Sequence, residues 1–150
     1  MFGRLIDPMP TPDLTRFITA QDPVYNDVLS ELHKGQKRSH WMWFIFPQID
    51  GLGHSSTAKR YAIKRAYEAR EYLSHPIVGK RLLECAEAVK DIHDRSASQI
   101  FGYPDDMKFR SSLTLFASVA GEKSIFHGLI TKYYAGKHDE RTVEILRGLW

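Results

Sequence analysis

Residues 39–61 read SHWMWFIFPQIDGLGHSSTAKRY, and the first third of this stretch decides the fold class. From Ser39 to Phe46 it is almost wholly apolar or aromatic and it stops at Pro47, a length that suits either a buried strand or a short buried helix. No other segment alternates apolar and polar residues with enrichment in β-branched types, so a strand here would have no partner. We therefore expect a short buried helix and an all-α protein.

Helical spacing of apolar residues continues on both sides of this stretch. Ser55 or Ser56 is a suitable N-cap for a helix in which small and apolar residues recur as far as Leu73. Further runs with a helical period lie between Pro, Gly and Asp residues of the kinds that begin or end helices. We expect a tail at residues 1–12 and, at 13–150, a single compact domain of about seven helices.

Composition places the chain in the globular class. Of its 150 residues, 43% are hydrophobic and 26% are charged, which argues against an intrinsically disordered chain. The lone Cys85 excludes an internal disulfide and a cysteine-rich metal site. The histidines are scattered, without the H-x-x-x-H or HExxH spacing of a helical metal site, so we expect neither a metal nor a cofactor.

The sequence favours a protein of the cytoplasm. The opening stretch, MFGRLIDPMPTPD, has neither the apolar core nor the small-residue cleavage pattern of a secretory signal. The longest apolar run, from Trp41 to Pro47, is far shorter than the ~20 residues of a membrane span. We therefore expect a cytoplasmic protein without a membrane segment.

Positive charge is concentrated in one part of the chain. The net charge is +3, but the region 34–65 holds seven Lys or Arg residues against one acid, Asp50. The seven are Lys34, Lys37, Arg38, Lys59, Arg60, Lys64 and Arg65. The remainder of the molecule is therefore net acidic. This asymmetry supports one hypothesis for function, a non-enzymatic module that binds nucleic acid or a partner protein through the basic 34–65 region.

Three features within residues 39–61 suit a small anionic ligand. Aromatic side chains at 41–46 can stack on a flat ring. A glycine loop at 51–53 runs into a hydroxyl-rich helix start at 55–59, where free backbone N–H groups favour negative charge. Each feature also has a purely structural interpretation, as core aromatics, a turn and a helix cap. The stretch contains neither a Walker loop nor a complete dinucleotide fingerprint.

A second polar stretch reads DDMKFRSSLTLF at residues 105–116. Lys108 lies three residues before Ser111 and four before Ser112, so the three side chains share one helix face. If that face looks into a pocket, it supplies a cation and two hydroxyls. In the alternative, the hydroxyls bond back to the preceding helical turn and Lys108 is solvated. The stretch lacks the G-x-S-x-G elbow of a serine hydrolase.

Our leading hypothesis is a pocket for a small anionic or phosphorylated ligand, such as a nucleotide derivative, in which the two polar stretches meet. The residues expected to line it are Trp41, Trp43, Gln48, Gly51, Gly53, Ser55, Ser56, Lys59, Lys108 and Ser111. His40 is the candidate acid or base should a reaction be catalysed, and a structural histidine bonded to a carbonyl is the alternative. Enzymatic activity and oligomeric state both stay open on the residues alone.

Four motifs together resemble an uncharacterised bacterial family, filed as a domain of unknown function, over roughly residues 13–147. They are W-M-W-F-I-F-P-Q at 41–48, G-L-G-x-S at 51–55, D-x-x-K-F-x-S-S-x-T-L-F at 105–116 and G-x-x-D-x-x-T at 136–142. The resemblance implies a small all-α fold and brings no established activity. Some members carry the label calpastatin, which we reject because inhibitory segments of that type are disordered, whereas this composition forms a core.

Overall fold

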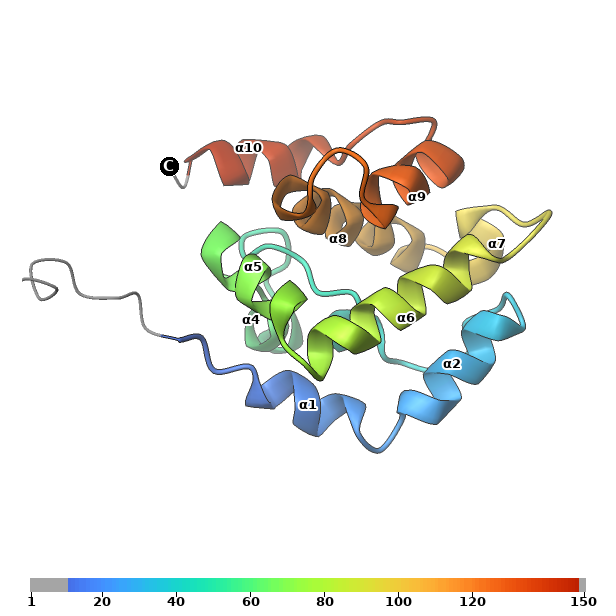
Figure 1. Ribbon diagram of the computed structural model, residues 1–150, viewed down its shortest axis with the longest axis horizontal. Helices are drawn as coiled ribbons and strands as arrows, with labels where there is room; N and C mark the ends of the chain where they lie inside the picture. Colours follow the sequence, from blue (N-terminus) through green and yellow to red (C-terminus); the bar gives the residue numbers. More distant parts are fainter. Residues whose placement is uncertain (1–10, 149–150) are drawn as a thin grey trace, which may run out of the picture.

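The computed structural model describes residues 11–148, and every regular element in that range is a helix (Figure 1). In order these are α1 (Thr15–Gln21), α2 (Tyr25–His33), α3 (Met42–Ile45), α4 (Ser56–Tyr61), α5 (Ala66–Ser74), α6 (Val78–Lys90), α7 (Ala97–Phe101), α8 (Asp105–Ala120), α9 (Ile125–Tyr134) and α10 (Glu140–Gly148). The prediction of an all-α protein is confirmed. Of the tail predicted at 1–12, residues 1–10 lie outside the described range.

The described residues form ten helices, so the prediction of about seven was too low. One cause is the stretch from Ser55 to Leu73, which we expected as one helix and which forms two, α4 and α5. Between them Ile63 pairs with the 48–50 segment: its N–H donates to the Gln48 carbonyl and its own carbonyl accepts from the Asp50 N–H, both at 2.8 Å. A residue whose backbone is paired in this way cannot continue a helix. Two of the ten helices, α3 and α7, are very short, with four and five residues.

Arg16 of α1 holds the junction between α4 and α5. Its guanidinium donates to the carbonyls of Arg60 at 2.7 Å and Ala62 at 3.0 Å, and it pairs with the Glu68 carboxylate at 3.2 Å. The other oxygen of that buried carboxylate accepts from the Lys64 N–H at 2.7 Å. Backbone groups that lost their helical partners at the break are therefore satisfied by side chains.

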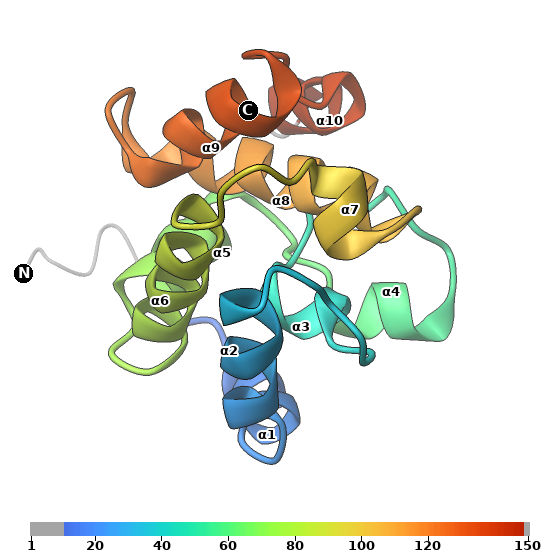
Figure 2. The same cartoon turned by 90° about the vertical axis from the view of Figure 1, so that its right-hand side faces the viewer.

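The helices lie in three tiers, with α8 at the centre of the contacts. In Figure 1, α8, α9 and α10 form the upper tier, α5 and α6 cross the middle, and α1 and α2 lie below. Helix α8 packs against α5, α7, α9 and α10, and the short α3 lies between α1, α4, α6 and α8 (Figure 2). Residues 111–117 of α8 are all buried, as expected for a helix covered on every side.

Aromatic side chains fill the space between α3 and α8. The rings of Phe46 and Phe109 meet edge to face with centroids 4.9 Å apart, and Phe101 packs against Phe109 at 4.5 Å. Trp41 packs against Phe46 from the other side, with centroids 6.3 Å apart. Four large buried rings in contact contribute much of the core's apolar burial. The aromatic segment of the sequence is therefore mainly a core segment.

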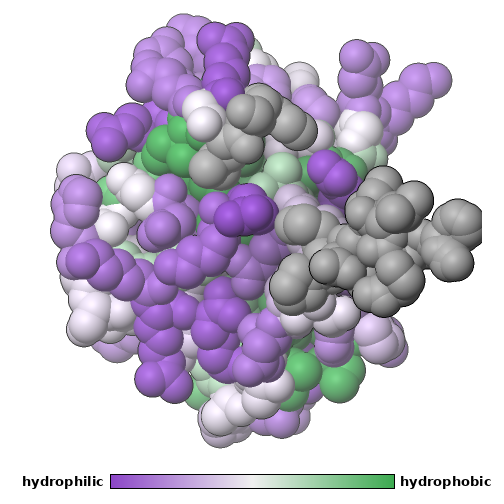
Figure 3. Space-filling view, turned by 90° about the vertical axis from the view of Figure 1, so that its left-hand side faces the viewer, coloured by the Kyte–Doolittle hydropathy of each residue, from purple (hydrophilic) through white to green (hydrophobic). Residues whose placement is uncertain are grey.

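Over the part seen in Figure 3, the outer surface is largely hydrophilic with separate small hydrophobic patches. None of the helices formed by residues 11–148 is long and apolar enough to cross a membrane.

Candidate functional site

The two tryptophans of the aromatic segment have different surroundings. Trp41 is 1% exposed and belongs to the core, whereas Trp43, two residues further along, is half-buried and reaches the surface. Both were predicted to line a ligand pocket. Since Trp41 is enclosed by protein, only Trp43 is open to a ligand.

Glu31 at the end of α2 fixes the loop that leads into the aromatic segment. Its carboxylate accepts from the Arg38 N–H at 2.8 Å, from both the N–H and the hydroxyl of Ser39, and from the Trp41 indole N–H at 2.9 Å. Partial burial by itself raises the pKa of Glu31, but these four hydrogen bonds to the charged form outweigh burial and lower the pKa to about 2. This role could not be predicted from the sequence, because a glutamate on a helix surface has the same spacing whether or not a loop folds over it.

A row of alternating charged groups and aromatic rings connects this loop to the start of α8. The Lys37 ammonium is 2.7 Å from one oxygen of Asp105 and lies over the Trp41 ring, 5.1 Å from its centroid. The Lys108 ammonium is 3.4 Å from the other Asp105 oxygen and lies over Trp43, 3.8 Å from its centroid. Two cations thus share one carboxylate, which leaves the cluster with a net charge of +1. The two polar stretches of the sequence meet here. Two of the residues that join them, Lys37 and Asp105, were not among those predicted to line the ligand pocket.

The glycine loop meets the same tryptophan from another side. A Cβ atom placed on Gly53 would lie 2.7 Å from the Cβ of Ala58 and 3.7 Å from the Trp43 ring, so only glycine fits at this approach. Gly51 has φ +106° and abuts Ile145 of α10. These two positions explain the glycines by close packing and by backbone conformation.

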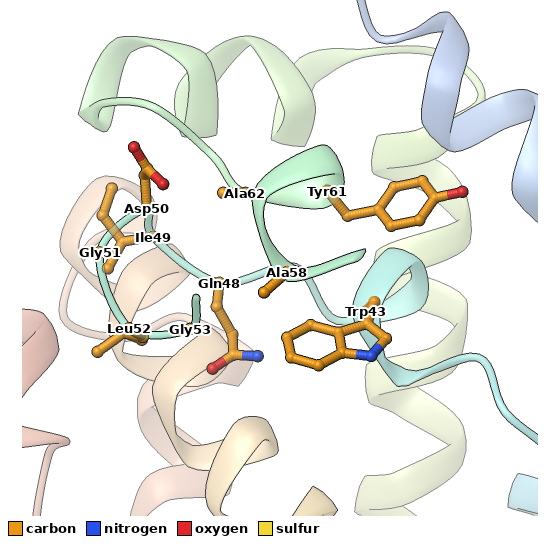
Figure 4. Close-up of a pocket in the computed structure, with 10 residues that line it drawn as sticks. All are labelled: Trp43, Gln48, Ile49, Asp50, Gly51, Leu52, Gly53, Ala58, Tyr61 and Ala62. Carbon is orange, nitrogen blue, oxygen red and sulfur yellow. The ribbon is translucent and has the colours of Figure 1, made fainter. Parts of the chain in front are cut away.

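The cavity enclosed by this loop is very small. Figure 4 shows Trp43, Gln48, Gly53, Ala58 and other residues around it, with the Gln48 amide pointing toward the indole. Its volume is about 10 Å³, which is the room that one water needs. Within residues 11–148 the Gln48 side chain makes no hydrogen bond to protein, so its amide is available to an outside partner. The cavity itself therefore has no room for a molecule larger than water.

The predicted residues of α4 lie outside this cavity. Ser55, Ser56 and Lys59 are all exposed, and the Ser55 hydroxyl accepts from the Ala58 N–H at 3.1 Å as an N-cap. A helix-end donor that we assigned to an anion is thus already paired. Since α4 has only six residues, its dipole adds little.

Of the two serine hydroxyls predicted on one face of α8, that of Ser111 follows the structural alternative and that of Ser112 does not. The Ser111 hydroxyl donates to the Met107 carbonyl one turn back, at 3.1 Å, and the residue is buried. Among the buried side-chain N and O atoms of the described residues, the Ser112 hydroxyl is the one without a hydrogen-bond partner. His40 is exposed in the loop before α3, and its side chain makes no hydrogen bond within the described part of the chain. The Ser111 hydroxyl is therefore already engaged within its own helix.

The basic region is only partly free of ion pairs. Lys37 is paired with Asp105 and its side chain is 6% exposed. Lys64 lies 3.7 Å from Asp50 and remains exposed, and Arg60 lies over the ring of Tyr61. The excess of cations in this region is accordingly smaller at the surface than it is in the sequence.

The chain closely resembles a protein of known structure, the conserved hypothetical protein Rv1873 from Mycobacterium tuberculosis. The two chains are 50% identical, the match covers 90% of this chain and 96% of Rv1873, and the TM-score is 0.88. No curated protein matches this chain. Residues 11–146 match the family described as "Protein of unknown function (DUF1810)". The uncharacterised family that the motifs predicted is thereby confirmed, and the chain belongs to DUF1810.

Proposed function

We propose that the protein binds a small anionic ligand that carries a flat ring, such as a nucleotide or nucleotide derivative, at the surface formed by Trp43, Gln48 and Lys108. The observation that carries this proposal is the Lys108 ammonium 3.8 Å above the centroid of the half-buried Trp43 ring, within a cluster of net charge +1.

The charge balance of the cluster supports an anion. Asp105 is closer to Lys37, at 2.7 Å, than to Lys108, at 3.4 Å, so the first pair is the tighter one. Lys108 keeps N–H donors for a further acceptor, and its side chain is 21% exposed. A phosphate or carboxylate bound there would neutralise the net charge and gain a charge-assisted hydrogen bond.

The neighbouring groups support a flat ring beside the anion. The exposed part of Trp43 offers an aromatic surface, and the Gln48 amide, which points toward it, can both donate and accept at the edge of a heterocycle (Figure 4). The ligand would cover this surface from outside, because the cavity behind it has the volume of one water.

The proposed site leaves out several residues that the sequence suggested. Trp41 is enclosed in the core, the Ser55 hydroxyl caps α4, and Ser111 bonds to its own helix. We do not propose the 34–65 region as a nucleic-acid surface, because Lys37 forms a largely buried ion pair with Asp105 and is not available to a phosphate.

The test is a thermal-shift screen of nucleotides and phosphorylated metabolites, since a ligand that binds only the folded state raises the melting temperature. We expect at least one compound to raise it in the wild type, and Lys108→Gln to weaken that compound about tenfold or more, the loss of a charge-assisted contact. Lys80→Gln removes the same charge from an exposed position on α6 and serves as the matched control. The proposal fails if no compound stabilises the protein, or if the two variants bind the active compound equally well.

A further inference from the structure

Two histidines that are separate in the sequence meet in the fold. His127 is in the first turn of α9, and His138 follows the end of that helix, in the turn before α10. Their rings lie with centroids 5.5 Å apart at an interplanar angle of 63°. Ala135 in the left-handed conformation and Gly136 at φ +77° reverse the chain between them. The sequence spacing alone did not indicate this pair.

The pair lines a pocket between α8, α9 and α10 that is suited to an anion. Its volume is about 260 Å³, against the ~10–15 Å³ that a single water needs, so a small molecule fits. The lining residues are Thr114, Ser118, His127, His138, Val143, Leu146 and Arg147. They include a guanidinium, two imidazoles and two hydroxyls, and no carboxylate is among the described residues that line it. An anion placed there meets the guanidinium and the two imidazoles and no like charge, whereas the hydroxyls of Thr114 and Ser118 already donate to the carbonyls of Arg110 and Leu115.

A backbone hydrogen bond fixes the tautomer of His127. The ring Nδ1 lies 2.9 Å from the Gly121 carbonyl oxygen, which can only accept, so Nδ1 carries the proton and donates it. Nε2 remains as the second ring nitrogen. In the neutral ring it presents a lone pair, and in the charged ring it becomes an N–H donor while the bond to Gly121 is kept. An oxyanion therefore favours the charged form of this histidine.

Charged groups on the neighbouring elements determine how strongly the pair attracts an anion. A groove of about 470 Å³ shares His138 and Arg147 with the pocket and adds Arg110, Lys137, Glu140 and Glu144. Arg110 is already engaged, since it donates to the carbonyls of Lys137 and His138 at 2.8 and 3.1 Å. The three cations attract an anion, and the two glutamates repel it. Arg147 is the cation that borders both spaces and is exposed.

We propose that this pocket binds a phosphate group, either free or on a small metabolite, through Arg147 and the His127–His138 pair, with uptake of protons by the histidines. Arg147 supplies permanent charge, and each imidazolium supplies one N–H donor at its free nitrogen. The Ser118 hydroxyl lies at the same wall and donates to the Leu115 carbonyl at 2.6 Å. Binding is then stronger in mildly acidic solution than in mildly basic solution.

This pocket is separate from the Trp43 surface. On α10, Val143, Leu146 and Arg147 are three and four residues apart and so share one face. Ile145, which abuts Gly51 of the glycine loop, lies on another face of the same helix. The two sites can therefore be tested independently.

The experiment is a titration of the full chain with sulfate and with inorganic phosphate at constant ionic strength, at about pH 6 and about pH 8, on either side of the range in which histidine titrates. The imidazole nitrogen resonances are followed by NMR, with His127→Gln and His138→Gln used to assign them. Sulfate keeps the same charge at both pH values, so its pH dependence reports on the protein. Arg147→Gln is compared with Arg141→Gln, which removes the same charge from an exposed position of α10 that does not line the pocket.

We expect both anions to shift the resonances of His127 and His138, and sulfate to bind at least about tenfold tighter at the lower pH. Arg147→Gln should weaken binding about tenfold or more, while Arg141→Gln and Lys108→Gln stay within about twofold of the wild type. The inference is overturned if Arg147→Gln and Arg141→Gln weaken binding equally, if Lys108→Gln abolishes it, or if the two histidine signals do not respond to either anion.

Discussion

Replacing Glu31 by Gln should destabilise the protein, because the Glu31 carboxylate receives four hydrogen bonds from Arg38, Ser39 and Trp41. A glutamine side chain has one acceptor oxygen and an NH₂ group that can only donate. At least one of these donors would then face another donor. Losing the hydrogen bond of the Trp41 indole N–H should cost the most, because this bond is partly buried and water cannot easily replace the acceptor.

The magnitude follows from the pKa of Glu31, which is lowered from its ordinary 4.5 to about 2 in the folded protein. Each pKa unit is worth about 1.4 kcal/mol, which gives at most ~3 kcal/mol, and solvent screening of a partly exposed carboxylate reduces this to about 1–2 kcal/mol. A group whose pKa is depressed by folding stabilises the protein above its unfolded pKa. That contribution is lost as the pH falls from about 4.5 toward about 2.

The assay is urea unfolding of the wild type and of Glu31→Gln at about pH 7 and about pH 3, with Glu122→Gln, an exposed residue between α8 and α9, as the charge control. At neutral pH we expect Glu31→Gln to lower the free energy of unfolding by about 2 kcal/mol, or the melting temperature by roughly 4–8 °C. The difference from the wild type should shrink at the lower pH, where the wild-type carboxylate becomes partly protonated. An equal difference at both pH values, or none at neutral pH, would refute the reasoning.

Four further substitutions test the packing around α8 and α6. Asp105→Asn leaves the nearly buried Lys37 without its counter-ion and should cost about 2–4 kcal/mol of unfolding free energy by urea titration, with Lys37→Met less costly because no unpaired charge remains. Ser112→Ala removes a buried hydroxyl that has no partner among the described residues, so the melting temperature should stay level or rise; a fall of several degrees would mean that the hydroxyl is satisfied in solution. Gly79→Ala would bring a Cβ within 2.2 Å of the Leu73 carbonyl oxygen, so we expect calorimetry to show a loss of about 3 kcal/mol or more in the free energy of unfolding. Unchanged stability would show that α5 and α6 can move apart at little cost in free energy.

The helical nature of the fold was predictable because it depends on local pattern. Periodic apolar residues and the capping hydroxyl of Ser55 are readable along the chain, and both are present in the structure. The break after α4 was not predictable, since it depends on Ile63 pairing with a segment some fourteen residues earlier. The helical spacing of alanines continues through that break and so does not predict it.

The site was predictable in part for the same reason. Lys108 and Trp43 were each predicted as site residues from the sequence around them, and in the structure they are in contact. The sequence could not predict which of two similar residues is buried. Trp41 lies in the core whereas Trp43 reaches the surface, and the Lys37 side chain is nearly buried whereas its neighbour Arg38 is exposed. The approach of His127 to His138 depends on how one turn reverses the chain, which the identity of the two residues does not specify.

The contacts of Arg16 link the stability of α1 to that of a distant part of the chain. One side chain satisfies carbonyls at Arg60 and Ala62 and the carboxylate of Glu68, so α1 cannot detach without leaving these groups unpaired. Regions coupled in this way open as one cooperative unit in hydrogen exchange. Amides of α1 and of residues 60–68 should therefore exchange at similar rates. During synthesis, the helix nearest the beginning of the chain gains its full set of partners only after residue 68 has left the ribosome.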